Sequence, residues 1–309
     1  MLNHVPVLLK EVIEYLGPKP GQNFVDGTFG GGGHARAILE RIGPKGRLFV
    51  FDLDPESISA ARALGPNVEH WQKNFRDLEE TIRYAAPYLP IHGVVLDIGI
   101  SSAQLSDPTL GLSFQETGPL NMRLERDKGM TAATIINTWK ENELAQLIRD
   151  FGEDYRAKQI AKAIVNRRRE QPFFNTTDLA EVITRAVARG RRIRSHIHPA
   201  TRTFQALRIV VNDELENLRF GIKGALRLLS KGGRLAVISF HSLEDRLTKQ
   251  LFKEASRDCV CPSSALRCVC AREPMNRLIT KKLVRPTDAE VTANPRARSA
   301  KLRVIEKIR

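Results

Sequence analysis

The stretch from 24 to 39, FVDGTFGGGGHARAIL, has the residue types of a ligand-binding loop. A short apolar run ends at Asp26, and five glycines follow within seven positions before a helical pattern begins. Such a turn lets backbone N–H groups approach dinucleotides or S-adenosylmethionine closely. Residues 30–35 also fit the loose spacing of a nicotinamide fingerprint, with Asp52 placed to bind a ribose. An acid at the strand end, however, repels a pyrophosphate and attracts ammonium and sulfonium groups, so Asp26 favours S-adenosylmethionine.

Further acids follow apolar runs that read as strands. Asp52 and Asp54 lie in FDLDP, and Asp54 precedes a proline, which is typical of a helix start whose side chain acts as a cap. Asp52 is therefore expected to bind the ribose. Asp97 in VVLDIGISS ends the next strand inward, where the crevice of an open parallel sheet lies, although such an acid can also cap the following turn.

All four cysteines of the chain lie in one short segment, CVCPSSALRCVC, at Cys259, Cys261, Cys268 and Cys270. Disulfides are not expected in a reducing cytoplasm, whereas two thiolate pairs closing a loop suit tetrahedral zinc. The C-x-C spacing is less typical than C-x-x-C. A structural zinc site and four thiols without a metal both stay open.

A sheet is needed to bring the acids together. Short apolar runs predict strands at 23–26, 47–52, 92–98, 231–241, 278–284 and 300–308. The first three end in acids and alternate with helical segments, as buried parallel strands do. Between 105 and 203 the apolar spacing is helical with no intervening strand. We therefore predict an α/β domain of residues 1–104 and 204–309, interrupted by an inserted helical domain of residues 105–203.

The charge balance is strongly basic. Lys and Arg outnumber Asp and Glu by 49 to 35, a net charge of +14, and much of the excess is clustered at 167–169, 189–198 and 294–303. Clustered cations favour a nucleic-acid partner over a merely solvated surface. No apolar run approaches the length of a membrane span, and the charged first segment is unlike a secretion signal, so we expect a cytoplasmic protein with no membrane partner.

Longer motifs occur in a fixed order along the chain: HVPVLLKEV, DGTFGGGGHARAIL, FDLDP, DIGISSAQL, GPLNMR, HPATRTFQALRIVVNDEL, GGRLAVISFHSLEDR and NPRARSAKLRV. Over essentially its whole length the chain thereby resembles the bacterial small-subunit rRNA cytosine-N4 methyltransferases, the MraW or RsmH type. The resemblance implies a class I S-adenosylmethionine-dependent methyltransferase fold, Rossmann-like with a mostly parallel seven-stranded sheet, and an inserted helical domain that recognises RNA. It also implies N4-methylation of a cytidine in the decoding centre of 16S rRNA, within the small ribosomal subunit.

The resemblance also implies a donor site. Matched by residue type, it consists of Gly32, Gly33, His34, Asp52, Phe75, Asp97 and Gln104. Loop amides would bind the methionine carboxylate, and Asp52 the ribose hydroxyls. Phe75 would form an apolar wall against adenine, although packing in the core explains a phenylalanine equally well.

Substrate contacts are expected in the insertion. The chain departs from the family pattern at Ala103, Leu110, Leu112 and Asn121, which bears more on substrate positioning than on donor binding. The residues expected to contact RNA are Asn121, Arg123, Arg191, Arg192, Arg194 and Arg202.

The N4 amine of cytosine is a poor nucleophile because its lone pair is delocalised into the ring. Acceptors that hold its N–H groups would turn the lone pair toward the methyl group. Such positioning is expected to supply most of the rate enhancement. Asp97, Ser101 and Ser102 are candidate acceptors. His241 could accept the released proton or stack on the base, or it could only lie beside a cap formed by Ser242 and Asp245 at a helix start.

Other functions stay open. A DNA amino-methyltransferase would share the donor site, but its typical Pro-Pro-aromatic turn is absent from residues 97–102. A basic RNA-binding assembly factor could keep the donor loop as a relic, and a nicotinamide dehydrogenase is opposed by Asp26. The oligomeric state is open as well, with a homodimer as one expectation.

Overall fold

The computed structural model describes residues 6–188, 198–259, 261, 270 and 273–309. The chain forms two compact units, one of residues 1–99 and 215–309 and the other of residues 100–214. The expected boundaries were 104/105 and 203/204. Residues 204–214 belong to the helical unit because apolar side chains there, such as Phe204 and Leu207, are buried in that unit's core.

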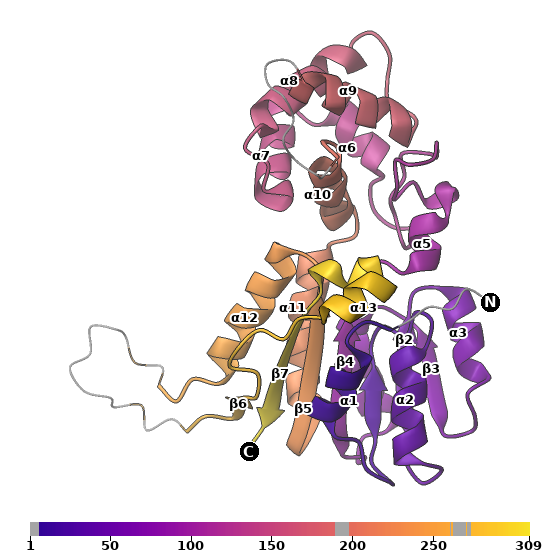
Figure 1. Ribbon diagram of the computed structural model, residues 1–309, viewed down its shortest axis with the longest axis vertical. Coiled ribbons are helices and arrows are strands. Elements are labelled where there is room, and N and C mark those ends of the chain that lie inside the picture. The colour runs from indigo at the N-terminus through magenta and orange to yellow at the C-terminus, as the bar shows by residue number, and fades with distance from the viewer. Residues whose placement is uncertain (1–5, 189–197, 260, 262–269, 271–272) are drawn as a thin grey trace. The chain divides into compact units, whose positions relative to one another are not determined.

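The first unit is built on a seven-stranded sheet with the order β3-β2-β1-β4-β5-β7-β6 (Figure 1). The strands are β1 (Phe24–Asp26), β2 (Leu48–Asp52), β3 (Val68–Gln72), β4 (Ile91–Asp97), β5 (Leu229–Ser239), β6 (Asn276–Leu278) and β7 (Lys301–Lys307). The pairs from β3 across to β5 are parallel, and β7 is antiparallel to both β5 and β6. The predicted fold class, a mostly parallel seven-stranded sheet, is confirmed.

Two strands differ from the sequence prediction. The strand expected at 278–284 is only β6, which ends at Leu278; beyond it Ile279 and Thr280 both donate to the Val304 carbonyl, and Val284 returns as a single bridge to Leu302. The edge strand β3 was not foreseen, because it is only partly buried and so lacks a continuous apolar run.

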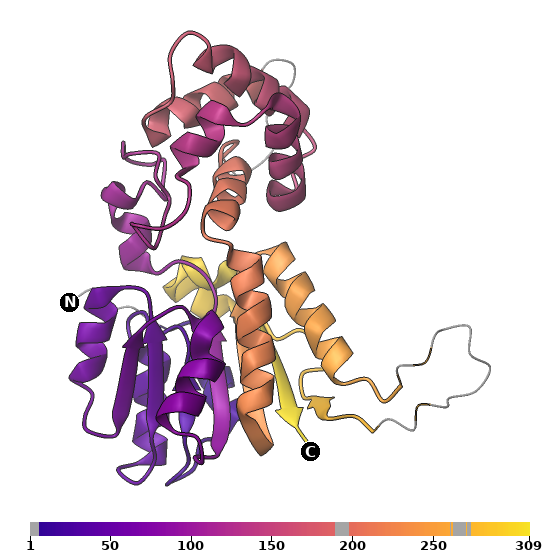
Figure 2. The ribbon, with the colours of Figure 1, turned by 180° about the vertical axis from the view of Figure 1, so that it is seen from behind.

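Helices cover both faces of this sheet. On one face, α1 (Leu9–Leu16) and α2 (Gly33–Ile42) pack on alternate strand residues such as Phe24 and Val50. On the other face, the intervening strand residues, such as Val25, are covered by α4 (Leu78–Ala85), α11 (Glu214–Leu228) and α12 (Ser242–Ala255). Figure 1 shows α1 and α2 in front of the sheet, and Figure 2 shows α11 on the opposite face. The period-two alternation of strand side chains produces these two cores.

Shorter elements complete this unit. They are α3 (Pro55–Arg62), η1 (Phe75–Asp77), α13 (Asp288–Ala293) and η3 (Pro295–Ser299). Among the helices of the described residues, none combines the length and the hydrophobicity that a membrane-spanning helix needs.

The described residues of the second unit form helices joined by loops, with one isolated β-bridge between Pro119 and Asn175 and no strand. Its elements are α5 (Ser102–Ser106), η2 (Pro108–Leu110), α6 (Ala132–Thr138), α7 (Glu141–Gly152), α8 (Ala157–Arg168), α9 (Thr176–Ala188) and α10 (Thr201–Val211). Apolar residues at three- and four-residue spacing, such as Leu144, Leu147 and Ile148 of α7, form its core. Leu112, one of the departures from the family pattern, is buried in this core, and Leu110 packs against it.

Candidate active site

Three acids lie at the carboxyl ends of neighbouring parallel strands. Asp26 ends β1, Asp52 ends β2 and Asp97 ends β4, and β1 pairs with both of the other strands. Carboxyl ends of adjacent parallel strands meet at one edge of a sheet, where open α/β folds bind ligands. The structure therefore brings together the three acids that the sequence singled out.

The glycine loop is shaped by its lack of side chains. Gly30 and Gly32 have φ values of 50° and 73°, a region that favours glycine, and a Cβ on Gly32 would lie 2.5 Å from the Phe29 ring. Gly33 begins α2, and a Cβ there would lie 2.6 Å from Pro6. The loop thereby delivers the first turn of α2, with its N–H groups, to the end of β1. One of these groups, the N–H of Ala35, lowers the pKa of the Asp26 carboxyl.

Asp26 and Asp97 are acids whose charged form is poorly solvated. Burial raises the pKa of Asp26 to about 7, and the nearby Asp52 charge raises it further, against hydrogen bonds from the Thr28 and Ala35 N–H groups. Burial, together with the carboxylates of Asp26 and Glu244, raises the pKa of Asp97 to about 8. Among the described residues, neither Asp26 Oδ2 nor Asp97 Oδ1 has a hydrogen-bond partner. Two buried acceptors thus face one another's charge and lack a donor or a cation.

His34 lies beside this pair. Its Nε2 is 3.0 Å from the Val7 carbonyl oxygen, and its Nδ1 is 3.8 Å from Asp97 Oδ2. The ring, on the first turn of α2, is buried. His34 therefore connects the glycine loop to the acid at the end of β4.

Asp52 and Asp54 have the different roles that the sequence indicated. Asp52 Oδ2 accepts the Gly30 N–H at 2.7 Å and Oδ1 accepts the Asp54 N–H at 2.9 Å, while burial raises its pKa. Asp54 caps α3, accepting the Glu56 N–H at 3.0 Å and the Ser57 hydroxyl at 2.9 Å. Each Asp52 oxygen retains a second lone pair, so Asp52 can still accept ribose hydroxyl groups.

Phe75 lies in η1 and is half-buried. A Cβ on Gly221 of α11 would lie 2.4 Å from its ring, and one on Gly27 would lie 3.2 Å from its Cβ. The side chain therefore packs on α11 beside the first glycine of the loop. This placement agrees both with core packing and with the expected wall of an adenine site.

His241 is itself the cap of α12, which corrects the cap expected from Ser242 and Asp245. The Glu244 N–H donates to His241 Nδ1 at 3.4 Å, and Glu244 Oε2 accepts the N–H groups of Phe240 and His241 at 2.8 and 3.2 Å. Asp245 instead pairs with Arg303 at 2.7 Å. An imidazole nitrogen replaced the usual hydroxyl as the cap acceptor, and the simple Ser/Asp pattern missed it.

Other predicted site residues lie in the second unit. Ser101 caps α5, accepting the Gln104 N–H at 3.1 Å, and Gln104 Oε1 accepts the Ser101 N–H at 2.9 Å. Ser102 is the first residue of α5, and its side chain lies outside the described part of the chain. This capping box gives Ser101 and Gln104 a structural role, and their functional roles stay predictions.

The predicted RNA contacts are placed only in part. Asn121 Oδ1 accepts the Arg123 Nε–H at 2.9 Å, and Arg202 donates to the Glu153 carbonyl at 2.7 Å. These bonds orient both arginines on the helical unit. Three predicted contacts lie outside the described residues: Arg191, Arg192 and Arg194.

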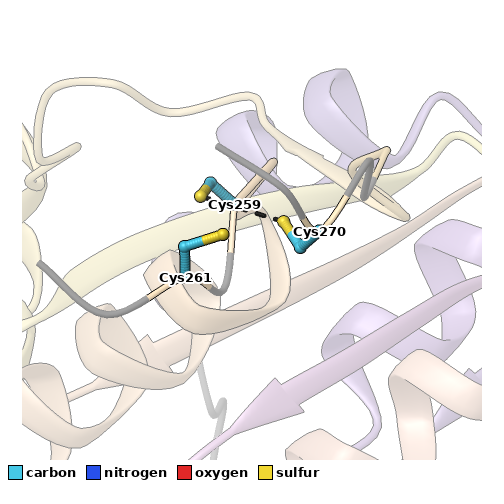
Figure 3. Close-up of side chains that lie close together, drawn as sticks. All are labelled: Cys259, Cys261 and Cys270. Carbon is cyan, nitrogen blue, oxygen red and sulfur yellow. Dashed lines mark hydrogen bonds between the residues drawn. The ribbon is translucent and has the colours of Figure 1, made fainter. Parts of the chain in front are cut away.

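The described cysteines form one cluster in the first unit (Figure 3). The sulfur atoms of Cys259, Cys261 and Cys270 all lie within 4.8 Å of one another, and those of Cys259 and Cys270 are 3.8 Å apart. Cys268, the fourth predicted ligand, lies outside the described residues. Three thiols at this spacing match part of a tetrahedral thiolate site.

The acids and the loop fit a ligand with charges of both signs. The first turn of α2 presents N–H groups to a carboxylate, and the unpartnered oxygens of Asp26 and Asp97 suit a cation. The profile of the MraW methylase family matches residues 1–308. The chain belongs to the MraW methylase family.

Curated relatives of this methylase-family chain match it over their full length. Ribosomal RNA small subunit methyltransferase H of Thermomicrobium roseum is 48% identical, covering 99% of this chain and 94% of that protein. Its namesakes from Geotalea uraniireducens and Heliobacterium modesticaldum are 49% and 44% identical, covering 99% of both proteins and 100% of both proteins respectively. Among solved structures, an rRNA methylase from Streptococcus thermophilus covers 99% of each chain at 11% identity, with a TM-score of 0.42 that is too low to support an inference.

Proposed function

We propose that this chain transfers a methyl group from S-adenosylmethionine to the N4 amine of a cytidine in the decoding centre of 16S rRNA. The relatives that match it over its full length are small-subunit rRNA methyltransferases by name. The observation that carries the choice of donor is the pair of buried carboxylate oxygens, on Asp26 and Asp97, beside a glycine loop. A nicotinamide pyrophosphate would meet two acids there, whereas a sulfonium donor meets complementary charge.

Each part of the donor has a candidate partner on this chain. The N–H groups at Gly32, Gly33 and His34 hold the methionine carboxylate at the start of α2. Asp52 accepts the ribose hydroxyls, and Phe75 contacts the adenine. S-adenosylmethionine, when bound, supplies an electrophilic methyl group, and the chain's own residues hold it and exclude water.

Methyl transfer also requires that the target amine be oriented and then lose a proton. Asp97 accepts an N4–H hydrogen bond, which turns the amine lone pair toward the methyl group, and the serines at 101 and 102 are the further candidate acceptors. Formation of the N–C bond breaks the bond between the sulfur and the methyl group and leaves a positive charge on N4. One N–H proton then passes to Asp97; the alternative acceptor, His241, would first have to give up the Glu244 N–H at its Nδ1. Positioning supplies most of the rate, because no covalent intermediate on the protein is needed.

The helical unit of residues 100–214 is the proposed RNA-recognition domain. It carries Arg123 and Arg202 on its described surface, and in the sequence it contains the run of arginines between α9 and α10. Cationic side chains of this kind bind phosphates and release counterions. Because bacterial small-subunit rRNA is a cytoplasmic molecule, the proposed location is the cytoplasm; the homodimer stays a prediction.

We also propose a structural zinc ion at the cysteine cluster. Cys259, Cys261 and Cys270 supply three thiolates at the observed spacing, and the sequence offers Cys268 as the fourth ligand. The ion would stabilise the segment after α12 and would take no part in methyl transfer.

Mass spectrometry of 16S rRNA nucleosides tests the function directly. Purified protein, S-adenosylmethionine and rRNA from a strain without this gene should yield N4-methylcytidine, either in free rRNA or in the small subunit. An Asp97→Ala variant should yield far less product. A wild-type protein that binds the donor and methylates neither substrate would contradict the proposal and favour an assembly factor.

A further inference from the structure

One face of α9 carries a stripe of five side chains, of which only Ala180 belongs to the buried core of the helical unit. Thr177, Ala180, Glu181, Thr184 and Arg185 recur at three- and four-residue spacing and line a cavity of about 380 Å³. This spacing places them one above another along the helix. The core of the unit takes other α9 residues, Leu179 and Ile183 among them.

Two aromatic rings complete the cavity. Phe114 and His198 also line it, and their rings are stacked with centroids 4.6 Å apart and planes 29° from parallel. Phe114 is held by an edge-on contact with Phe204 of α10 at 4.9 Å. His198 accepts the Ala200 N–H through Nδ1 at 3.2 Å, so the neutral ring carries its proton on Nε2. The rings are thus held in place by the start of α10.

The polar groups of the cavity have a definite character. Thr184 donates its hydroxyl proton to the Ala180 carbonyl at 2.8 Å, which leaves its oxygen as an acceptor. Glu181 contributes a second acceptor, and Arg185, which contacts Glu181, is 71% exposed and retains further donors. An occupant should therefore offer N–H groups to the threonine and the glutamate, and an anionic group to Arg185.

We infer that this cavity binds one unpaired nucleobase of the RNA substrate, a base that carries an exocyclic amine, with its phosphate at Arg185. The inference rests on the proposed function and concerns a base other than the methylated cytidine. The volume of the cavity lies within the range of small-molecule sites, about 300–1,000 Å³. Aromatic platforms flanked by cations are the usual means of binding unstacked bases in RNA.

The sequence adds a second reason to choose RNA. Residues 189–197, which join the end of α9 to His198, include Arg189, Arg191, Arg192 and Arg194. The side of the cavity formed by α9 and the side formed by His198 therefore both continue along the chain into the most basic run of the helical unit. A peptide partner would gain less from so many cations than a phosphate backbone does.

Three variants test the inference. Thr184→Trp fills the cavity, His198→Ala removes a stacked ring, and Arg185→Ala removes the cation. With unmethylated 16S rRNA, free and in the small subunit, each should raise KM about five-fold or more while kcat changes little, because binding is lost equally in the ground and transition states. Arg149→Ala, which removes an exposed arginine from α7 outside the cavity, is the matched charge control and should leave KM within about two-fold.

Ultraviolet crosslinking gives a readout that does not depend on activity. Irradiation of the wild-type complex with the same rRNA, followed by peptide mass spectrometry, should give nucleotide adducts on peptides containing Phe114 or His198. Adducts should disappear in Thr184→Trp, whose melting temperature and donor affinity should match those of the wild type. Because the crosslinking uses the wild-type protein, it tests the inference even if the His198→Ala variant folds poorly.

The outcomes separate the two proposals. Normal methylation with unchanged KM in the folded Thr184→Trp variant, and no adducts at Phe114 or His198, would overturn the inference alone. Adducts formed there only with a ribosomal protein would overturn it as well. Adducts with rRNA in a wild type that transfers no methyl group would support the cavity as an RNA site and contradict the proposed function.

Discussion

Donor binding should release protons, because the two buried acids at the ends of β1 and β4 are partly protonated in the ligand-free protein. Their pKa values are about 7 for Asp26 and about 8 for Asp97. At pH 7.5 the pair therefore holds about one proton in total. A sulfonium and an ammonium placed against the carboxylates favour their charged forms, which lowers both pKa values and expels that proton.

The sign and size of the pH dependence follow from this linkage. Since the free protein binds more protons than the complex, affinity for S-adenosylmethionine rises with pH. If both acids are fully ionised in the complex, the rise between pH 6.5 and 7.5 is about twenty-five-fold. Of the other titratable groups nearby, Asp52 raises the pKa of Asp26 and Glu244 raises the pKa of Asp97, while His34 Nδ1 lies 3.8 Å from Asp97 Oδ2.

Isothermal titration calorimetry measures the released proton directly. The titration is repeated at pH 7.5 in buffers of different ionisation enthalpy. The slope of the observed binding enthalpy against the buffer ionisation enthalpy should correspond to about one proton released per S-adenosylmethionine. S-adenosylhomocysteine shares the amino acid group but lacks the sulfonium charge, so it should release clearly less. In Asp97→Asn the release should fall to about a quarter of a proton, because only Asp26, with a pKa of about 7, remains to release one.

A matched control uses an exposed acid of the same unit. Asp288→Asn on α13 removes one exposed carboxylate and should leave the released proton unchanged. A slope of zero for the wild type at pH 7.5, or equal slopes for the two ligands, would refute the reasoning. A slope of zero would mean that the carboxylates are already ionised before the donor arrives, and equal non-zero slopes would mean that the sulfonium charge does not cause the release.

The remaining predictions concern the donor, stability, the metal and RNA. Asp52→Ala should weaken S-adenosylmethionine binding by about 1.5–3 kcal/mol, and calorimetry on a folded variant with full affinity would remove Asp52 from the site. Asp26→Asn should stabilise the ligand-free protein, by up to about 4 kcal/mol at pH 8 and by about half as much at pH 5.5, because the raised pKa makes the wild type lose stability from about pH 4 to pH 7. Urea unfolding at both pH values checks this, and equal gains would contradict it. Elemental analysis should find about one zinc per chain, and Cys261→Ser should lower the melting temperature without changing donor affinity. If protein prepared without chelators contains no zinc, the zinc proposal is wrong. RNA affinity should lose part of its salt dependence, with donor binding intact, when alanines replace Arg191, Arg192 and Arg194. An unchanged salt slope would make that run a solvated surface.

Local sequence patterns were sufficient for most of the sheet and for the acids at its edge. Apolar runs that end in Asp26, Asp52 and Asp97 identify buried parallel strands, because a strand covered on both faces needs an unbroken apolar segment. The Asp-Pro pair likewise identified Asp54 as a cap. The sequence did not predict the edge strand β3, because a half-exposed strand has no unbroken apolar segment.

Tertiary structure decided what these residues contact. The coupling between Asp26, Asp97 and Glu244 depends on strand order, which places β1 beside β4, and strand order is set by packing over the whole sheet. His241 acts as the cap of α12 because of the position of one imidazole nitrogen, which no residue pattern gives.

The same distinction holds for the helical unit and for the cysteines. Phe114 and His198 are far apart in the chain, and only the folded helical unit stacks their rings beside the α9 stripe. The spacing of the cysteines suggested a metal, but the approach of Cys270 to Cys259 is a property of the folded segment. Sequence determines which groups are available and which local elements they belong to, because these depend on near neighbours along the chain. Contacts between distant segments depend on how the cores pack, and the chemistry of both sites arises from those contacts.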